Sequence, residues 1–270
     1  MAIDKLFFAG KRPARYCVIG TGGVECFLRE RRGLRRLHAV ETSGWMNMNP
    51  DDGERLAAKL GKHAWGVFLR SDAFIFNVFD FERLPHGEAR RRELAQWRLE
   101  KVFPEDTTDF IHAVLHPGGK RLLSVLLSKK DAVVVENWFR EHSIRLTFLG
   151  NSTIELMNRL WAGKLKTFSR PSPQVLVELD HQLGMVVFQD SGRPYYIRKF
   201  RCDSEDGFRR EMRKTLEFVK SNYTRTPRTV AFFPGKPVFT FSQPTAIWRE
   251  LELRLMAIPA GVKLTLPGGE

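Results

Sequence analysis

The sequence has few cysteines and no long hydrophobic segment. Its three cysteines, Cys17, Cys26 and Cys202, are too few and too scattered for a disulfide framework or a zinc site. The longest apolar runs, such as Leu122–Leu127 and Val230–Phe233, have the length of buried strands and not the ~20 residues of a membrane span. The opening Met-Ala-Ile-Asp-Lys lacks the apolar core of a signal peptide. These absences predict a soluble cytoplasmic protein with reduced thiols.

The sequence also lacks the motifs of common catalytic sites. It contains no Gly-x-Ser-x-Gly, no His-Glu-x-x-His and no complete Walker loop, and no Ser/His/Asp arrangement stands out. His112 and His116 share one face of a predicted strand, but no third metal ligand lies nearby. Asp203, Glu205 and Asp206 precede a predicted helix, whose positive N-terminal end they suit. We therefore predict no catalytic residue, no cofactor-binding residue and no metal site.

Negative charge is scarce as well. Lys and Arg number 44 against 31 Asp and Glu, so the formal net charge is +13. The positive charge is concentrated in Arg29–Arg36, Arg90–Arg92, Arg193–Arg201 and Arg209–Lys214. Nucleic acid is one candidate partner, but the runs are divided among separate elements, are mixed with Glu and accompany no known nucleic-acid-binding motif. A solvated basic face, or attraction to an anionic membrane surface, is the preferred interpretation.

Alternation of apolar residues predicts strands, and helical spacing predicts helices, along nearly the whole chain. The first half is predicted to contain strands 15–19, 24–30, 34–41, 64–69, 74–81, 110–116, 120–127 and 144–149 and helices 50–61, 87–103, 129–142 and 152–162. The second half is predicted to contain strands 174–180, 184–189, 194–200, 228–233 and 262–266 and helices 205–222 and 244–257. The basic, proline-containing segment 164–173 is predicted to be a linker.

Three of the helices carry local signals. Asp51 and Asp52 are the cap candidates of the first helix. Ser152-Thr-Ile-Glu155 has the pattern of a capping box and is predicted to open the fourth helix. In the second helix, Leu94, Trp97 and Lys101 or Val102 fall at helical spacing, and Pro104 ends the helix.

Each half of the chain opens with a similar β-hairpin. Tyr16-Cys-Val-Ile-Gly-Thr-Gly-Gly-Val-Glu-Cys-Phe-Leu-Arg-Glu30 reads as a strand, a tight turn and a second strand. Val175–Phe200 reads as the same arrangement followed by a Ser-Gly turn and a third strand. Each hairpin begins a strand-strand-strand-helix order, which predicts two units in which helices pack on a mixed sheet.

Taken in order, these features resemble the cytoplasmic actin-like proteins of type IV pilus and type II secretion assembly, PilM and the cytoplasmic part of GspL. Further cues are Trp97–Pro104, Ser152–Leu160, Gly192–Arg198 and Glu211–Phe218. The resemblance implies an α/β chain of the actin-like ATPase fold, with two ribonuclease-H-like lobes and an inserted small α/β subdomain. The first lobe would be residues 1–85 plus 150–170, and the second lobe residues 172–270. The insert, residues 86–149, would match the extra subdomain that PilM shares with the division protein FtsA.

In that family the two hairpin turns hold the phosphates of a nucleotide, and this chain departs from the pattern at each contact. The first loop of the family has an Asp, followed shortly by a Lys, whereas Val18 and Glu25 occupy these positions here and can neither hold Mg²⁺ nor attract phosphate. The second loop, Glu178-Leu179-Asp180, has no glycine for a close approach of phosphate. Near the adenosine site, Phe232–Lys236 keeps one glycine of a pair. The turn Gly20–Gly23 could offer backbone N–H groups to an anion, but a plain hairpin turn explains it better.

We therefore interpret the chain as a non-enzymatic scaffold or adaptor, a pseudo-ATPase without a cofactor. It would serve the inner-membrane platform of a type IV pilus or type II secretion system, in the cytoplasm and peripheral at the inner membrane. By the resemblance, its partners would be a hexameric assembly ATPase and the tail of a bitopic PilN- or GspM-like protein. We expect that tail to dock near the strand 74–81 and the helix 86–103, beside Arg90–Arg92. If the chain is GspL-like, its end Leu264–Glu270 would lead into a membrane helix.

Two other readings remain open. In the first, the chain is an active ATP-binding actin-like protein, and Gly20, Thr21, Gly22 and Gly235 contact the nucleotide. In the second, it is a basic nucleic-acid-binding protein, which would need its four basic runs to converge on one face.

Overall fold

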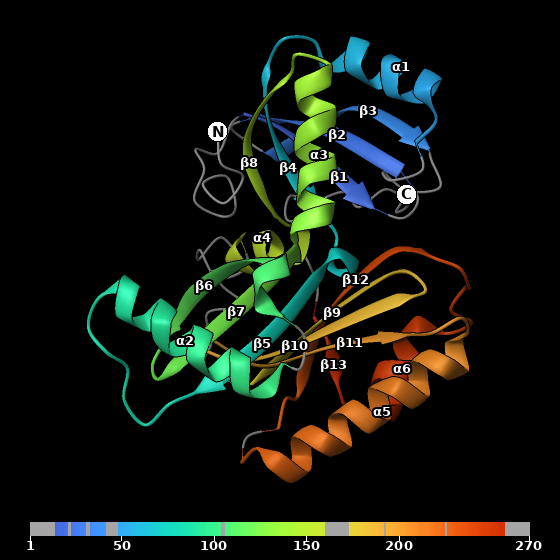
Figure 1. Ribbon diagram of the computed structural model, residues 1–270. Coiled ribbons are helices and arrows are strands. Elements are labelled where there is room, and N and C mark those ends of the chain that lie inside the picture. Colours follow the sequence, from blue (N-terminus) through green and yellow to red (C-terminus); the bar gives the residue numbers. More distant parts are fainter. Residues whose placement is uncertain are drawn as a thin grey trace. The chain divides into compact units, whose positions relative to one another are not determined.

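The computed structural model describes residues 14–20, 23–30, 33–41, 48–103, 106–159, 173–191, 193–224 and 226–256 (Figure 1). The chain divides into two compact units. One contains residues 1–75, 96–113 and 125–157, and the other contains residues 76–95, 114–124 and 158–270. Each unit is built on its own five-stranded mixed sheet.

The sheet of the first unit begins with an antiparallel meander. Its strands are β1 (Arg15–Gly20), β2 (Gly23–Glu30), β3 (Gly33–Glu41), β4 (Ala64–Leu69) and β8 (Arg145–Asn151), in the order β3-β2-β1-β4-β8. β4 runs parallel to β1, and β8 runs parallel to β4. Helices α1 (Pro50–Leu60) and α3 (Lys129–Glu141) contact β3 and β8, respectively. They lie close together, since a Cβ atom on Gly53 of α1 would be 3.4 Å from Nε1 of Trp138 of α3.

The sheet of the second unit repeats this topology. Its strands are β9 (Gln174–His181), β10 (Leu183–Asp190), β11 (Arg193–Arg201), β12 (Thr229–Pro237) and β13 (Arg254–Leu255), in the order β11-β10-β9-β12-β13. The first three strands form an antiparallel meander, and β12 and β13 follow parallel to β9. The two predicted meanders therefore lie in separate sheets with one shared strand order, as the duplicated hairpin indicated.

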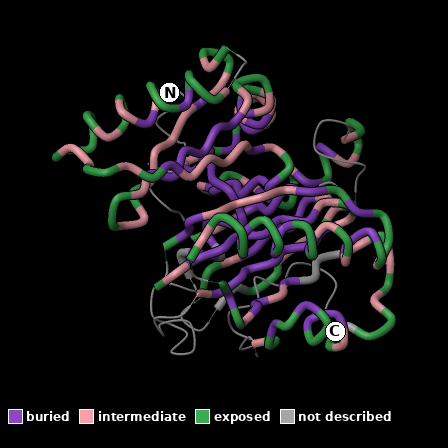
Figure 2. The backbone as a smooth tube through the Cα atoms, turned by 90° about the horizontal axis from the view of Figure 1, so that it is seen from below, coloured by how far each residue is buried: buried purple, intermediate pink, exposed green. Residues whose placement is uncertain are grey.

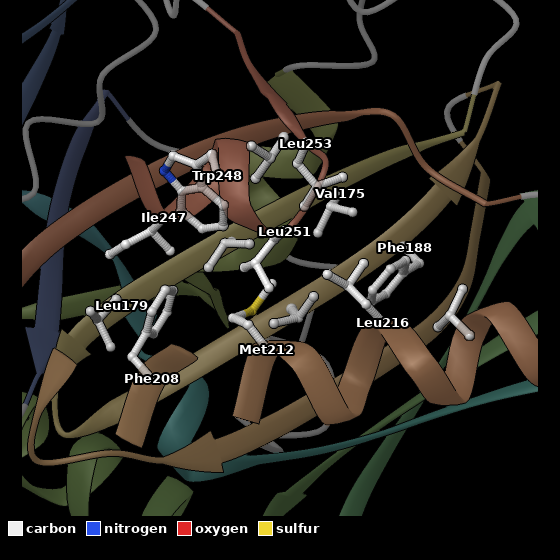
Figure 3. Packing of buried hydrophobic residues seen from close by; sticks show 14 of the residues in the cluster. Val175, Leu179, Phe188, Phe208, Met212, Leu216, Ile247, Trp248, Leu251 and Leu253 are labelled. Carbon is white, nitrogen blue, oxygen red and sulfur yellow. The ribbon is translucent and has the colours of Figure 1, made fainter. Parts of the chain in front are cut away.

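Helices α5 (Glu205–Asn222) and α6 (Pro244–Glu250) supply the core of the second unit. Phe208, Met212 and Leu216 of α5 are buried in one cluster with Ile247 and Trp248 of α6 (Figure 3). Val175, Leu179 and Phe188 of the sheet belong to the same cluster. The inward residues of α5 recur every three or four positions, as the amphipathic pattern of the sequence predicted.

A third sheet has three strands, β5 (Phe74–Asp80), β6 (Phe110–Gly118) and β7 (Arg121–Ser128), in the order β5-β7-β6. β5 is an edge strand of this sheet. Two strands pair differently from the sequence expectation. β5 was expected in the sheet of the first lobe but pairs with β7 in the third sheet. β8 was expected in the insert but pairs with β4 at the edge of the first sheet. The boundaries 1–85 plus 150–170, 86–149 and 172–270 stay a prediction.

Helix α2 (Glu88–Val102) lies within the helix predicted over 87–103. Ala95 and Leu99 are fully buried, whereas Trp97 is 49% exposed. Figure 2 shows the general pattern, in which strands are buried over much of their length and helices alternate between buried and exposed residues. Six of the 15 residues of α2 are apolar, and their spacing indicates a helix without indicating which side is buried.

Helix caps and ends also differ from the sequence reading. The cap of α1 is Asn49, whose Oδ1 accepts a hydrogen bond from the N–H of Asp52 at 2.8 Å, so Asp51 and Asp52 are not caps. Helix α4 (Ser152–Arg159) is capped by Asn151, one residue before the predicted capping box. A side-chain oxygen at either position can cap, and only the backbone conformation selects between them.

Helix α6 is shorter than predicted. It ends at Glu250, and β13 follows within the segment predicted as helix 244–257. The predicted strand 262–266, and the linker 164–173 except for its last residue, lie outside the described residues. None of the helices among the described residues combines the length and the apolar composition needed to cross a bilayer.

Candidate functional site

The turn of the first hairpin corresponds to the first phosphate loop expected from the resemblance. β1 and β2 pair from Arg15 with Leu28 to Gly20 with Gly23. This register leaves the two residues Thr21 and Gly22 for the turn, and both lie outside the described residues. The structure describes β1 up to Gly20 and β2 from Gly23.

Val18, which the resemblance aligns with a Mg²⁺-holding carboxylate, is buried in an apolar cluster. Its partners in the cluster are Tyr16, Phe27, Phe68 and Phe148, all no more than 3% exposed. The ring of Phe68 lies 5.2 Å from that of Tyr16 and 5.3 Å from that of Phe148. A carboxylate here would lose its hydration among aromatic rings, so the site is shaped for an apolar side chain.

Glu25, which the resemblance aligns with a lysine, lies directly across from Val18 in the β1–β2 register. It is buried, and its Oε1 lies 2.7 Å from Nη2 of Arg36 on β3. The negative charge is thus held by an ion pair within the sheet. A carboxylate in this place repels phosphate and does not attract it.

Arg70 lies over Gly20, at the end of β1. A Cβ atom on Gly20 would be 2.2 Å from Nε and 2.4 Å from Cδ of Arg70. Arg70 directly follows β4, is 8% exposed, and donates its backbone N–H to the carbonyl of Ile19 at 3.0 Å. The glycine therefore makes room for an internal arginine side chain. No local pattern in the sequence predicts this contact, because it depends on the parallel pairing of β1 with β4.

Polar side chains gather beside Arg70 at the carboxyl ends of β4 and β8. The hydroxyls of Ser71 and Thr153 are 2.5 Å apart. Asn151 donates from Nδ2 to the carbonyl of Leu69 at 3.4 Å and accepts from the N–H of Ile154 at 2.9 Å. Ligands of open α/β sheets often bind at such strand ends, but these groups are buried and hydrogen-bonded to one another.

The second hairpin has the same register as the first. β9 and β10 pair up to Asp180 with Leu183, which leaves His181 and Gln182 for the turn. His181 has a φ of 50°, as the first residue of a tight hairpin turn can have. Counted from the turn, Glu178 corresponds to Val18 and Asp180 corresponds to Gly20. Both carboxylates are buried. The second hairpin therefore has an acidic residue where the first has Val18, and it has Asp180 where the first has a glycine.

The segment compared with the adenosine site is filled with aromatic side chains. Phe232 of β12 lies 5.0 Å from Trp248 and 5.5 Å from Phe241, measured between ring centroids. Phe241 also lies 5.3 Å from Phe208 of α5 and 5.1 Å from Phe239. The chain after Phe232–Lys236 thus folds back on its own strand and packs into the core of the second unit.

The two histidines considered as metal ligands have other partners. Nδ1 of His112 lies 2.9 Å from Oε1 of Gln96, and Nδ1 of His116 lies 3.1 Å from Nη1 of Arg91. An arginine beside His116 disfavours a cation there. Nowhere in the described part of the chain do three or more His, Cys, Asp or Glu side chains gather closely enough to hold a metal ion.

The acidic group before α5 serves the helix and its neighbours. Ser204 caps α5 by accepting from the N–H of Gly207 at 3.2 Å. Glu205 accepts hydrogen bonds from the N–H of Ser242 at 2.7 Å and from Arg209 at 2.5 Å. These bonds, first that from Arg209, hold the pKa of Glu205 below its usual value. Glu205 and Asp206 lie in the first turn of α5, as expected from the sequence, and Glu205 also ties α5 to the segment before α6.

No protein-family model matches the sequence, and no curated protein matches it. Solved structures do match. One is the PilM-PilN type IV pilus biogenesis complex, at 14% identity and a TM-score of 0.69, over 90% of this chain and 87% of that chain. A second is the cytoplasmic domain of EpsL, an inner-membrane component of the type II secretion system of Vibrio cholerae, at 10% identity and a TM-score of 0.55, over 90% and 89%.

A third similar structure is a Bacteroides thetaiotaomicron protein of unknown function with an actin-like ATPase fold. It is 10% identical, with a TM-score of 0.57, over 90% of this chain and 91% of that chain. At these identities the likeness is one of fold. The chain has the actin-like ATPase fold, an α/β architecture with two mixed sheets that resemble ribonuclease-H-like lobes, and its structure resembles PilM and the cytoplasmic domain of a GspL-type protein, as predicted.

Proposed function

We propose that this chain is a non-enzymatic scaffold of a type IV pilus or type II secretion inner-membrane platform, with a nucleotide site that has lost its function. The full-length likeness to PilM and to cytoplasmic EpsL supports the class of protein. The scaffold role rests on this chain's own residues. The proposed location is the cytoplasm, at the inner membrane.

The observation that carries the proposal is the interior of the first hairpin. Val18 is enclosed by four aromatic side chains, and Arg70 fills the space over Gly20. Phosphate needs an open backbone, and Mg²⁺ needs oxygen ligands. The Arg70 side chain covers the backbone at Gly20, and Val18 and its aromatic neighbours offer no oxygen ligand. These buried side chains would have to move before a nucleotide could enter.

The proposed partners are a membrane-anchored tail of the PilN or GspM type and a hexameric assembly ATPase. The matching pilus structure contains PilM together with PilN, which supports a partner of the first kind. β5 offers a possible contact, because an edge strand can pair with an extended peptide. On β5, Phe74 and Phe79 are buried and Phe76 is half-buried.

Much of the positive charge that suggested nucleic acid is paired with carboxylates. Arg36 pairs with Glu25, and Arg198 pairs with Glu211 at 2.7 Å. Three more residues of the basic runs, Arg209, Arg213 and Lys214, also form ion pairs. Nucleic-acid binding depends on cations that are free to meet phosphates, so this pairing favours a protein scaffold.

Two observations favour the second candidate, an ATP-binding protein. Glu178 keeps a carboxylate at the position that corresponds to the family's acid, and Gly235 remains in the loop of the adenosine site. In that case, the Arg70 side chain would have to swing away from Gly20. The two candidates differ in their response to Mg-ATP.

The scaffold function is tested by titrating the isotopically labelled chain with the cytoplasmic tail peptide of a PilN-type protein and following amide shifts. We expect shifts near 74–81 and 86–103. Shifts confined to 174–256 would place the interface away from β5 and α2, and no binding of either a PilN-type or a GspM-type tail would contradict the proposed partners.

A further inference from the structure

Helix α2 has one exposed side that combines an aromatic ring with unpaired positive charge. Successive residues of an α-helix are 100° apart, and the buried Ala95 and Leu99 define the inward side of α2. Trp97 lies on the side opposite to them and is 49% exposed. Trp97 is therefore the residue at the centre of the exposed side of α2.

The two flanks of this helix differ in charge. The flank on one side of Trp97 carries Arg90, Leu94, Arg98 and Lys101. The flank on the other side carries Glu93, Gln96 and Glu100, of which Gln96 and Glu100 share a hydrogen bond of 2.8 Å. We call the outermost residue and the first flank, Arg90, Leu94, Trp97, Arg98 and Lys101, the basic ridge.

The basic ridge keeps its charge available. Arg90, Arg98 and Lys101 are exposed, and none of them forms an ion pair with a carboxylate among the described residues. Nζ of Lys101 lies 3.8 Å from the centre of the Trp97 ring, a cation–π contact. This differs from α5, where Arg209, Arg213 and Lys214 are held by glutamates.

We propose that the basic ridge lies on an anionic phospholipid surface. A tryptophan flanked by Lys and Arg is the arrangement found where proteins contact the headgroup region, because the ring is amphipathic and the cations meet lipid phosphates. The ridge is the convex outer side of a helix, which suits a flat surface. A peptide partner would need a groove or a free strand edge.

The contact would be weak alone. One basic residue near an anionic leaflet raises the partition coefficient about fivefold, and a single Trp ring adds about tenfold. Stable attachment normally takes a second signal. The proposed membrane-anchored partner would supply it, so the biological role of the ridge rests on the proposed function, although its lipid binding does not.

The test is sedimentation of the whole chain with vesicles of phosphatidylcholine that contain one third phosphatidylglycerol. We expect binding to these vesicles, none to pure phosphatidylcholine, and loss of binding in high salt. Trp97→Ala should weaken binding about tenfold, and Arg98→Gln with Lys101→Gln by more than tenfold.

Two matched variants serve as controls. Phe218→Ala removes another exposed aromatic side chain, 45% exposed, from α5. Arg92→Gln removes a positive charge from α2 outside the ridge, where Arg92 contacts Glu88 at 3.4 Å. Phe218→Ala should leave vesicle binding within about twofold of wild type. Arg92→Gln should weaken vesicle binding less than the combined Arg98→Gln and Lys101→Gln changes do.

Equal binding by wild type and Trp97→Ala, equal binding to neutral vesicles, or no vesicle binding would each overturn the proposal. So would amide shifts on the ridge with a Glu-rich peptide and none with anionic micelles, because the ridge would then be a peptide site. The vesicle assay contains no partner protein and the tail titration contains no lipid, so either proposal can fail without the other.

Discussion

Arg70 and Gly20 are packed so closely that the glycine has no space for a side chain. A Cβ atom on Gly20 would be 2.2 Å from Nε of Arg70. The two residues are brought together by the parallel pairing of β1 and β4, in which Ile19 lies beside Leu69. The glycine at the end of β1 thus leaves room for an arginine side chain of the same unit.

Replacing Gly20 by alanine should therefore destabilise the protein. The added methyl group would displace the buried Arg70 side chain, and overpacking of this kind costs about 1–3 kcal/mol of unfolding free energy. Chemical denaturation measures the change. Gly53→Ala is the matched control, because Gly53 lies inside α1 with its nearest neighbour 3.4 Å from the new Cβ atom, and it should stabilise by about 0.5–1 kcal/mol.

The origin of that cost can be checked with a double mutant. If Arg70 is the obstacle, Gly20→Ala should cost less in the background of Arg70→Ala, with a coupling of about 1 kcal/mol. Strictly additive effects would mean that the arginine does not limit the space at Gly20.

Replacing Val18 by aspartate, the residue that the resemblance implies there, should destabilise the protein and should not create a magnesium site. Val18→Asp places a carboxylate among Tyr16, Phe27, Phe68 and Phe148, which should cost about 3 kcal/mol or more. Val18→Thr, close in shape and uncharged, should cost less. A Val18→Asp protein as stable as wild type would show that the cluster is open to water.

We expect Glu205 to account for part of the loss of folding stability at acidic pH. Its pKa is lowered in the folded protein by the hydrogen bonds from Arg209 and Ser242. A group with a lowered folded pKa contributes stability above its unfolded pKa, and this contribution is lost as the pH falls through the folded value. Denaturant titrations from neutral pH to below the ordinary Glu value of 4.5 should show a smaller acid slope for Glu205→Gln, and an unchanged slope would argue against this network.

The three thiols should resist modification in the folded protein. Cys17 and Cys26 lie opposite each other with their Sγ atoms 3.7 Å apart and are fully buried. Burial raises the pKa of Cys17, and burial raises that of Cys202 to about 11, so few thiolates exist at neutral pH. A thiol reagent should label the protein only after addition of denaturant. Fast labelling of Cys17 or Cys26 in the native protein would contradict their burial between β1 and β2.

Local sequence patterns were sufficient to predict both hairpins and both meanders. The turns at Gly20–Gly23 and Asp180–Leu183 are marked by turn residues between alternating strands, and such signals act over a few residues. The partners of β5 and β8 could not be read in this way. β8 joins β4 across more than seventy intervening residues, and nothing local specifies which strand completes which sheet.

The candidate site was predictable in part for the same reason. The substitutions at Val18 and Glu25 follow from the motif alone, whereas the packing of Arg70 on Gly20 requires the strand pairing. The buried side of α2 could not be read from the spacing of Leu94 and Trp97, because Ala95 and Leu99 are the fully buried residues and Trp97 is exposed. The cap Asn49 was missed because two aspartates followed it at equally plausible positions.

Calorimetric titration of the whole chain with Mg-ATP tests the central claim, that the nucleotide site no longer functions. The account predicts no heat of binding at micromolar protein, because Val18, Glu25 and Asp180 occupy positions where phosphate and Mg²⁺ need other residues. Micromolar affinity that disappears on Thr21→Ala would contradict it and would identify the chain as an ATP-binding member of this fold.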